Sequence, residues 1–150
     1  MMKRAWPLGL LLLAAAGCPE PSKRAQLAQL VYDLNNLHTW DEDRKAQGQY
    51  PYDAIMGCPP EIDHALAAAL TDLRPTAIHD RVSNRTVPVG DIAFLMLLER
   101  LKLKWEAFYK DGVFISTQLP NQVFCVKWDP GARGRVRARI QEILPPLDDE

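Results

Sequence analysis

Gly90-Asp91-Ile92-Ala93-Phe94-Leu95-Met96-Leu97-Leu98 is the segment around which the rest of this 150-residue chain must pack. Its seven consecutive apolar residues leave no polar face at a helical period, so the segment predicts a helix that is buried on all sides. The run is far too short to cross a bilayer, which takes about 20 apolar residues. Asp91 is a suitable N-cap residue, and Glu99 returns the chain to solvent.

Three further segments have the apolar spacing of amphipathic helices. They run from about Lys23 to Thr39, from Pro59 to Leu73 and from Gly131 to Leu144. Ser22 is a plausible N-cap for the first. We expect the last helix to pack through Val136, Ile140, Ile143 and Leu144.

Shorter segments predict strands. Residues 78–82 and 85–89 flank Ser83-Asn84, and residues 107–109 and 113–115 resemble a hairpin around Asp111-Gly112. Residues 122–128 form the clearest strand, with Lys127 on one face and Val126 and Trp128 on the other. The pattern predicts an α+β domain of about four helices and a small antiparallel sheet, with one buried central helix.

The amino terminus has the order of a secretory signal: Lys3-Arg4, then an apolar run from Leu8 to Ala16. Ala15-Ala16-Gly17-Cys18 resembles the lipobox of bacterial lipoproteins, which implies that Cys18 is acylated and becomes the first mature residue. The alternative is an ordinary cleaved signal with a cysteine nearby by chance. The resemblance implies a protein anchored in the cell envelope and facing the periplasm. Pro19, where an aspartate would resemble an inner-membrane retention signal, favours the outer membrane.

These features divide the chain into four parts. Residues 1–17 are the predicted signal peptide, residues 18–23 the lipidated cysteine and tether, residues 24–144 a single α+β domain, and residues 145–150 an acidic tail. Loss of Lys3 and Arg4 with the signal takes the formal net charge from −1 to −3. Nothing in that charge predicts nucleic acid as a partner.

Cys58 and Cys125 remain as an even pair in an oxidising compartment, where disulfides persist. A bridge between them would close a loop of about 68 residues, which the chain-entropy view values at roughly 4 kcal/mol. Two buried free thiols are the alternative, because sequence does not give the distance between the two residues.

Familiar catalytic, phosphate-binding and redox motifs are missing. Glu61 and His64 are spaced to reach one metal ion, and His79-Asp80 lies further along the chain, but a solvated helix face explains them better. Cys58 with His64 could form a reactive thiolate, although a disulfide is the preferred reading. We therefore predict no catalytic residues, no metal site and no cofactor.

Two regions are candidates for binding a partner. The first is a loop from Trp40 to Met56, with the aromatic residues Trp40, Tyr50 and Tyr52. The second is a basic end of the domain, formed by Arg133, Arg135, Arg137 and Arg139 with Lys127. A solvated helix face balanced by acidic neighbours is the alternative for the arginines.

Residues 85–94, Arg85 to Phe94, followed by the strand ending in Trp128, are similar to a pattern in uncharacterised bacterial exported proteins, in which a Val-Gly-Asp turn opens a buried helix. That resemblance implies no activity. The sequence favours a membrane-anchored envelope protein with a non-catalytic, protein-binding domain. An immunity-type inhibitor of a toxic effector and a hydrolase built on His64, His79 or Asp91 are the two alternatives.

Overall fold

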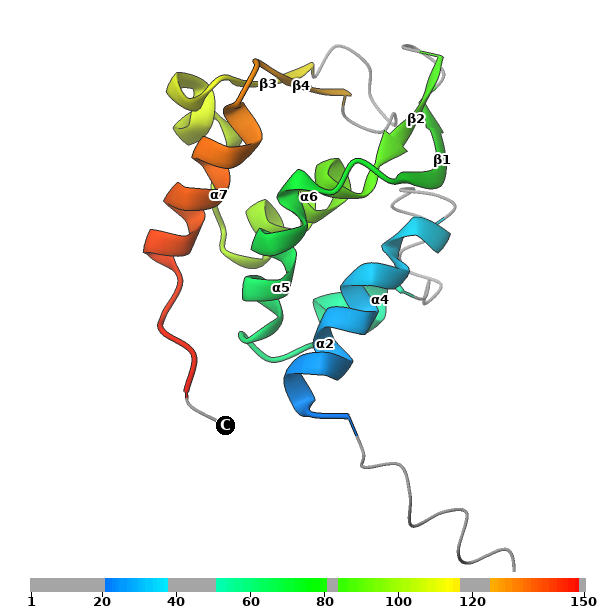
Figure 1. Cartoon of the computed structure of the whole chain (residues 1–150). Helices are drawn as coiled ribbons and strands as arrows, with labels where there is room; N and C mark the ends of the chain where they lie inside the picture. The colour runs from blue at the N-terminus through cyan, green and yellow to red at the C-terminus, as the bar shows by residue number, and fades with distance from the viewer. Residues whose placement is uncertain (1–20, 38–50, 81–83, 117–124, 149–150) are drawn as a thin grey trace, which may run out of the picture.

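The computed structural model describes residues 21–37, 51–80, 84–116 and 125–148. Within those ranges the chain forms α-helices, short 3-10 helices and two-stranded sheets (Figure 1). The elements are α2 (Lys23–Tyr32), η1 (Asp33–Asn36), α4 (Tyr52–Met56), α5 (Ile62–Ala68), η2 (Ala69–Thr71), β1 (Pro75–Asp80), β2 (Arg85–Pro88), α6 (Val89–Arg100), η3 (Trp105–Asp111), β3 (Val113–Ser116), β4 (Cys125–Trp128) and α7 (Ala132–Ile143).

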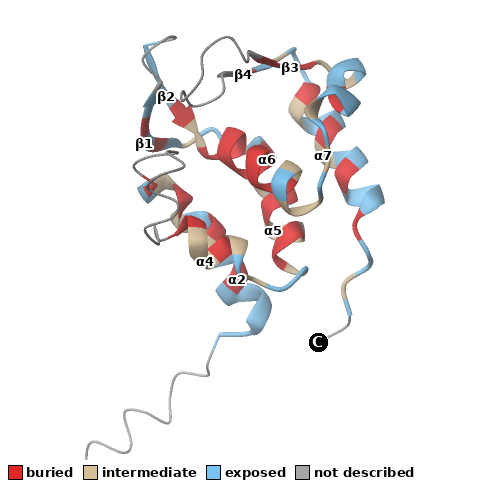
Figure 2. Ribbon diagram, turned by 180° about the vertical axis from the view of Figure 1, so that it is seen from behind, coloured by how far each residue is buried: buried red, intermediate tan, exposed pale blue. Residues whose placement is uncertain are grey.

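The central helix is α6, as the apolar run predicts. Every residue from Val89 to Leu97 is buried, and Figure 2 shows this helix as the most continuously buried part of the molecule. The prediction that Asp91 caps it is wrong, because Pro88 occupies the N-cap position and no side chain caps the helix. Asp91 lies inside the first turn, where its carboxylate accepts hydrogen bonds from Trp128 and Arg133.

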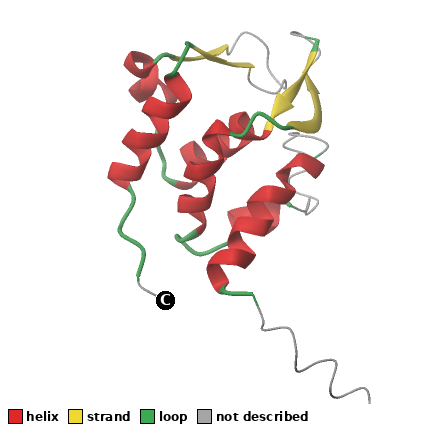
Figure 3. Ribbon diagram, in the orientation of Figure 1, coloured by secondary structure: helices red, strands yellow, loops and turns green. Residues whose placement is uncertain are grey.

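The other helices pack around α6. Helix α5 contacts α6, α2 and α7, so it joins the two sides of the helical layer (Figure 3). Ser22 caps α2 as expected, by accepting a hydrogen bond from the backbone N–H of Ala25 at 3.2 Å. Helix α7 packs through Val136, Ile140 and Leu144, whereas Ile143 is 51% exposed and does not belong to the buried side.

Two separate two-stranded antiparallel sheets complete the described fold and confirm the α+β class. The expected pairing of β1 with β2 is correct. The hairpin expected around Asp111-Gly112 is wrong, because residues 105–111 form η3 and β3 pairs with β4 instead. Gly112, at φ 93°, ends η3 in the left-handed conformation that favours glycine, and so allows β3 to start in a new direction.

The long loop expected between Trp40 and Met56 contains a helix at its end, since Tyr52–Met56 is α4. Within the described ranges no helix is both long and apolar enough to span a membrane.

The domain has two distinct ends. Helix α2 starts at one end, where the last described residues of the chain also lie, and β3, β4 and η3 form the other end (Figure 1). Both views of the molecule agree on this arrangement (Figure 2).

Candidate binding site

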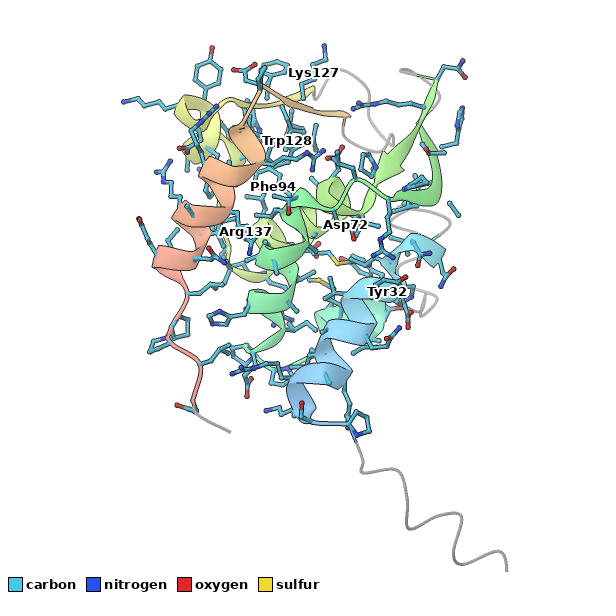
Figure 4. The ribbon with its side chains drawn as sticks, in the orientation of Figure 1. Tyr32, Asp72, Phe94, Lys127, Trp128 and Arg137 are labelled. Carbon is cyan, nitrogen blue, oxygen red and sulfur yellow. The ribbon has the colours of Figure 1, made fainter. Side chains whose placement is uncertain are left out.

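Arg133, the first of the predicted basic residues, is an internal residue. Its guanidinium donates to the Asp91 carboxylate and to the carbonyl of Leu70 at 2.9 Å, and it stacks 4.4 Å from the centre of the Trp128 ring. Trp128 Nε1 donates to the same Asp91 oxygen at 2.9 Å. Figure 4 shows Trp128 between β4 and α6, close to Phe94. Arg133 therefore connects α7, η2 and α6, and it is not free to bind a partner.

Burial raises the pKa of the Asp91 carboxyl above its ordinary value. The neighbouring Arg133 opposes this shift by its charge and its hydrogen bond, and so does the hydrogen bond from Trp128. Desolvation is the largest of these effects, so the ionised carboxylate is an energetic cost that its partners offset only in part.

The next arginines of α7 are also used within the fold. Arg135 donates to the carbonyls of Asp111 and Pro130, and Arg139 donates to the carbonyl of Ala107 and to the Asp111 carboxylate at 2.6 Å. Both side chains thereby attach η3 to α7. Arg137, labelled in Figure 4, forms no hydrogen bond or ion pair with any residue in the described ranges. Three of the four arginines of the predicted docking surface therefore bind residues of the described fold, while Arg135 and Arg139 remain exposed.

A second buried arginine, Arg100, was not singled out from the sequence. Its Nε donates to Asp63 at 2.5 Å, and its terminal nitrogens donate to carbonyl oxygens at the end of α4 and in the segment joining α4 to α5. Those carbonyls belong to Ile55, Met56, Cys58 and Pro59, at 3.0 to 3.3 Å. One guanidinium therefore holds the end of α4 and the following segment against α6. No local sequence pattern predicts this role for Arg100.

Of the three aromatic residues of the predicted loop, Tyr52 is the one that lies among the described residues. Trp40 and Tyr50 lie outside the described residues. Tyr52 is only 5% exposed, and its hydroxyl donates to Glu99 at 2.8 Å. Tyr52 therefore packs α4 against α6 and does not offer its ring to a partner.

The predicted cysteine pair stays a prediction. Cys58 is a free thiol and donates to the carbonyl of Ala54 at 3.0 Å. Cys125 begins β4, and its side chain lies outside the described part of the chain. Cys18, the predicted site of acylation, is also outside it.

The residues considered for metal binding or hydrolysis point to separate partners. Glu61 pairs with Lys23, Asp63 pairs with Arg100, and His64 Nε2 lies 2.7 Å from the carbonyl oxygen of Pro145. His79 is exposed on β1, and Asp91 is enclosed by Arg133 and Trp128. No group of three metal-ligating side chains occurs among the residues placed in the structure. His64 and Asp91 therefore bind different partners in the described part of the chain, and the hydrolase alternative stays a hypothesis.

An exposed surface does exist at the end formed by η3, β3 and β4. We call it the lysine–aromatic face and define it by Trp105, Tyr109, Phe114 and Lys127. Phe114 lies opposite Lys127 in the sheet and packs edge-to-face on Trp105, with 5.6 Å between ring centres. Tyr109 is 65% exposed and Phe114 is 47% exposed, which is unusual for such large rings.

A shallow cavity of about 410 Å³ lies within this face, bordered by Tyr109, Phe114, Lys127 and Asp129. Lys104 and Lys110 are exposed beside Trp105 and Tyr109 in the chain, and Glu106 is the exposed acidic neighbour. The side chains of Lys104, Lys110 and Lys127 form no ion pair or hydrogen bond to any residue that the structure describes. Figure 4 shows Lys127 at the outer limit of the molecule. The sequence correctly placed Lys127 on the opposite face of the strand from Val126 but did not identify the rings beside it.

A second cavity, of about 450 Å³, lies at the opposite end of the domain. It is lined by α2, α5 and the tail, through Lys23, Arg24, Leu27, Ala28, Glu61, His64, Ala65, Leu147 and Asp148. A hydrogen bond from Lys23 lowers the pKa of the Glu61 carboxyl below its ordinary value, so the Glu61 carboxyl at the mouth is ionised at neutral pH.

Comparisons of the chain with protein-family models, with curated proteins and with solved structures find no match. The features that bear on function are the lysine–aromatic face and the cavity at the opposite end of the domain.

Proposed function

We propose that this chain is a small lipoprotein of the bacterial cell envelope, anchored through an acylated Cys18, whose domain binds an acidic partner protein with its lysine–aromatic face. The observation that carries the binding role is the exposure of Tyr109 and Phe114 beside a lysine without an ionic partner among the described residues.

The position of this face supports the proposal. Helix α2 begins at Lys23, five residues after Cys18, and the lysine–aromatic face lies at the other end of the domain (Figure 1). A lipid on Cys18 would therefore hold the α2 end toward the bilayer and direct the face away from it. That orientation leaves the face accessible to a partner in the periplasm.

The chemistry of the face supports a protein partner of acidic character. Exposed aromatic rings supply most of the binding energy in many interfaces, because they bury a large area at a low cost in side-chain entropy. Three exposed lysines, Lys104, Lys110 and Lys127, lie on η3 and β4 or directly beside them. The acidic residues there are Glu106, Asp129 and Asp111, of which Asp111 is paired with Arg139. The lysines thus exceed the unpaired acidic residues, although the whole chain has a formal net charge of −1. The cations therefore reflect local placement, and they would steer an anionic surface onto the rings.

The anchor is tested by mass spectrometry of the mature amino terminus. We expect cleavage before Cys18 and an acylated cysteine, with the protein in the membrane fraction. The Cys18→Ser variant should lose the lipid and leave that fraction. An unmodified Cys18 in the wild-type protein would contradict the proposal.

The binding role is tested by photo-crosslinking in living cells, with a photoreactive phenylalanine analogue at Tyr109. We expect a discrete crosslinked partner that disappears when Lys127→Glu is added. The same analogue at Leu73, which is 67% exposed on another part of the surface, is the control and should not capture that partner. Equal capture from both positions, or no effect of Lys127→Glu, would overturn the role of the face.

A further inference from the structure

The cavity at the α2 end has the construction of a site for an elongated apolar group. Leu27 and Ala28 of α2, Ala65 of α5 and Leu147 of the tail supply apolar walls. Its volume of about 450 Å³ falls within the range of pockets that bind small ligands.

Four charged residues, Lys23, Arg24, Glu61 and Asp148, also line this cavity. Lys23 and Glu61 form an ion pair at 2.5 Å, and their side chains are 58% and 42% exposed. Their charges are therefore in solvent, and the aliphatic part of Lys23 extends the apolar wall. An amphipathic group with a polar end would fit this order of polar mouth and apolar interior.

The carboxyl-terminal tail completes the cavity. His64 Nε2 lies 2.7 Å from the carbonyl oxygen of Pro145, and because a carbonyl can only accept, this nitrogen donates its proton. The contact holds the tail beside α5, two residues before Leu147 enters the cavity wall. The tail is therefore part of the site.

We infer that this cavity seats an acyl chain carried by Cys18. The inference rests on the proposed function, since it requires that Cys18 is acylated. The chain reaches the cavity at Lys23, and the five residues from Cys18 to Lys23 span at most about 18 Å when fully extended. The lipid is thus attached within reach of the mouth.

The physical benefit arises whenever the protein is away from a bilayer. Each methylene exposed to water is unfavourable, so a lipoprotein in transit needs a place for its acyl chains. The domain would shield one chain itself, and insertion of that chain into a membrane would empty the cavity. The lysine–aromatic face, at the other end, stays free in both states.

The test feeds cells a fatty acid that carries a photoreactive diazirine and an alkyne, purifies the labelled protein, and irradiates it away from any bilayer once the detergent has been removed. Wild-type protein should incorporate the label at Cys18 and show additional crosslinks from the acyl chain to its own α2, α5 and tail peptides, the ones containing Ala28, Ala65 and Leu147. Labelled protein that shows no such internal crosslinks away from a bilayer would overturn the inference.

Two substitutions fill the cavity. Ala28→Phe introduces a ring at an exposed position of α2, and Ala65→Phe does so at a half-buried position of α5. Each should reduce the internal crosslinks at least fivefold while leaving incorporation of the label unchanged. Ala138→Phe, at an exposed position of α7, is the matched control and should leave the crosslinks unchanged. Ala28→Phe keeps the test decisive if Ala65→Phe impairs folding.

The Cys18→Ser variant separates the possible sources of the acyl chain. Internal crosslinks that persist in Cys18→Ser would mean that the cavity takes a free fatty acid, which contradicts seating of the chain on Cys18. Failure of the wild-type protein to incorporate any label would instead refute the anchor itself. Incorporation without internal crosslinks would refute only the inference.

Discussion

The surroundings of α6 and the lysine–aromatic face use positive charge in opposite ways. Around α6, Arg100 and Arg133 are largely buried and donate to carboxylates and carbonyls. Their charges therefore stabilise the contacts between α6 and the segments around it. On the face, Lys127 is exposed and has no ionic partner among the described residues, and the same holds for Lys104 and Lys110, which neighbour the face in the chain. The guanidinium suits the first role because it offers several donors in a fixed plane.

The difference shows which cations are available to a ligand. A count of basic residues along α7 favours the arginines as a docking surface, but the contacts of Arg133, Arg135 and Arg139 are internal. Removing a cation around α6 should therefore cost stability, whereas removing one on the face should cost only binding. The predictions below test that division.

The largest effect is expected from Arg100→Met. The substitution keeps most of the side-chain volume but leaves Asp63 buried without its partner and removes the guanidinium from four carbonyls. The carbonyls of Ile55 and Pro59 keep backbone N–H donors. Breaking a buried ion pair costs about 3–5 kcal/mol of unfolding free energy. Urea denaturation measures it, with Arg137→Met as the control, for which we expect a change within about 0.5 kcal/mol. Equal losses in the two variants would remove the distinction between buried and free arginines.

A smaller loss is expected from Gly90→Ala at the start of α6. A Cβ there would lie 2.5 Å from the Leu70 carbonyl oxygen and 3.0 Å from that of Asp72. Either the backbone around Leu70 and Asp72 or the start of α6 has to move, and overpacking of this kind costs roughly 1–3 kcal/mol of unfolding free energy. Gly134→Ala in α7 is the matched control, because its Cβ would meet nothing within 4 Å. It should stabilise the helix by up to about 1 kcal/mol, and destabilisation of both variants alike would contradict the role of close approach at Gly90.

A change of pH distinguishes the buried Asp91 from the exposed carboxylates. Because burial raises the pKa of Asp91, the folded protein binds this proton more tightly than the unfolded chain does. Its contribution to stability therefore rises as the pH falls through the raised pKa, and levels off below the ordinary value of about 3.9.

The comparison of the wild-type protein with Asp91→Asn isolates this group. Hydrogen bonds from Arg74 and Lys23 lower the pKa values of Asp72 and Glu61, so the stabilising contribution of these two carboxylates falls as the pH falls. The wild-type protein and Asp91→Asn share that loss. The stability of the wild-type protein relative to Asp91→Asn should therefore increase from pH 7 to pH 4, as measured by urea denaturation at each pH. A difference that stays constant or decreases would refute the raised pKa.

The sequence was sufficient for those parts of the fold that depend on a local pattern. The apolar run of α6, the Ser22 cap and the β1–β2 pair all follow from residue types within a short window. It failed for β3, because an Asp-Gly turn suggests a local hairpin whereas the true partner, β4, lies beyond residues 117–124. Pairing over such a distance is decided by packing on α6 and α7, which no local signal reports.

The candidate sites were harder to predict for the same reason. A guanidinium such as that of Arg133 looks like a surface charge in sequence until the fold places Asp91, Leu70 and Trp128 around it. Phe114 is the opposite case, an aromatic residue that the fold leaves exposed. Side chains alternate between the two faces of its strand, but this alternation does not say which face is packed against the core. Only the assembled structure shows that the outer side of this sheet is open.

The smallest effect on stability is expected from Lys127→Glu, and this prediction separates the two regions most sharply. The side chain is exposed opposite Phe114, so its charge can be reversed without breaking a described ion pair or hydrogen bond, and the unfolding free energy should change by less than about 0.5 kcal/mol. Capture of the partner from Tyr109 should nevertheless be lost, because an acidic surface is now repelled at the centre of the face. Arg137→Glu changes the net charge by the same amount elsewhere and should preserve capture. Loss in both variants would mean that total charge, and not the lysine–aromatic face, attracts the partner.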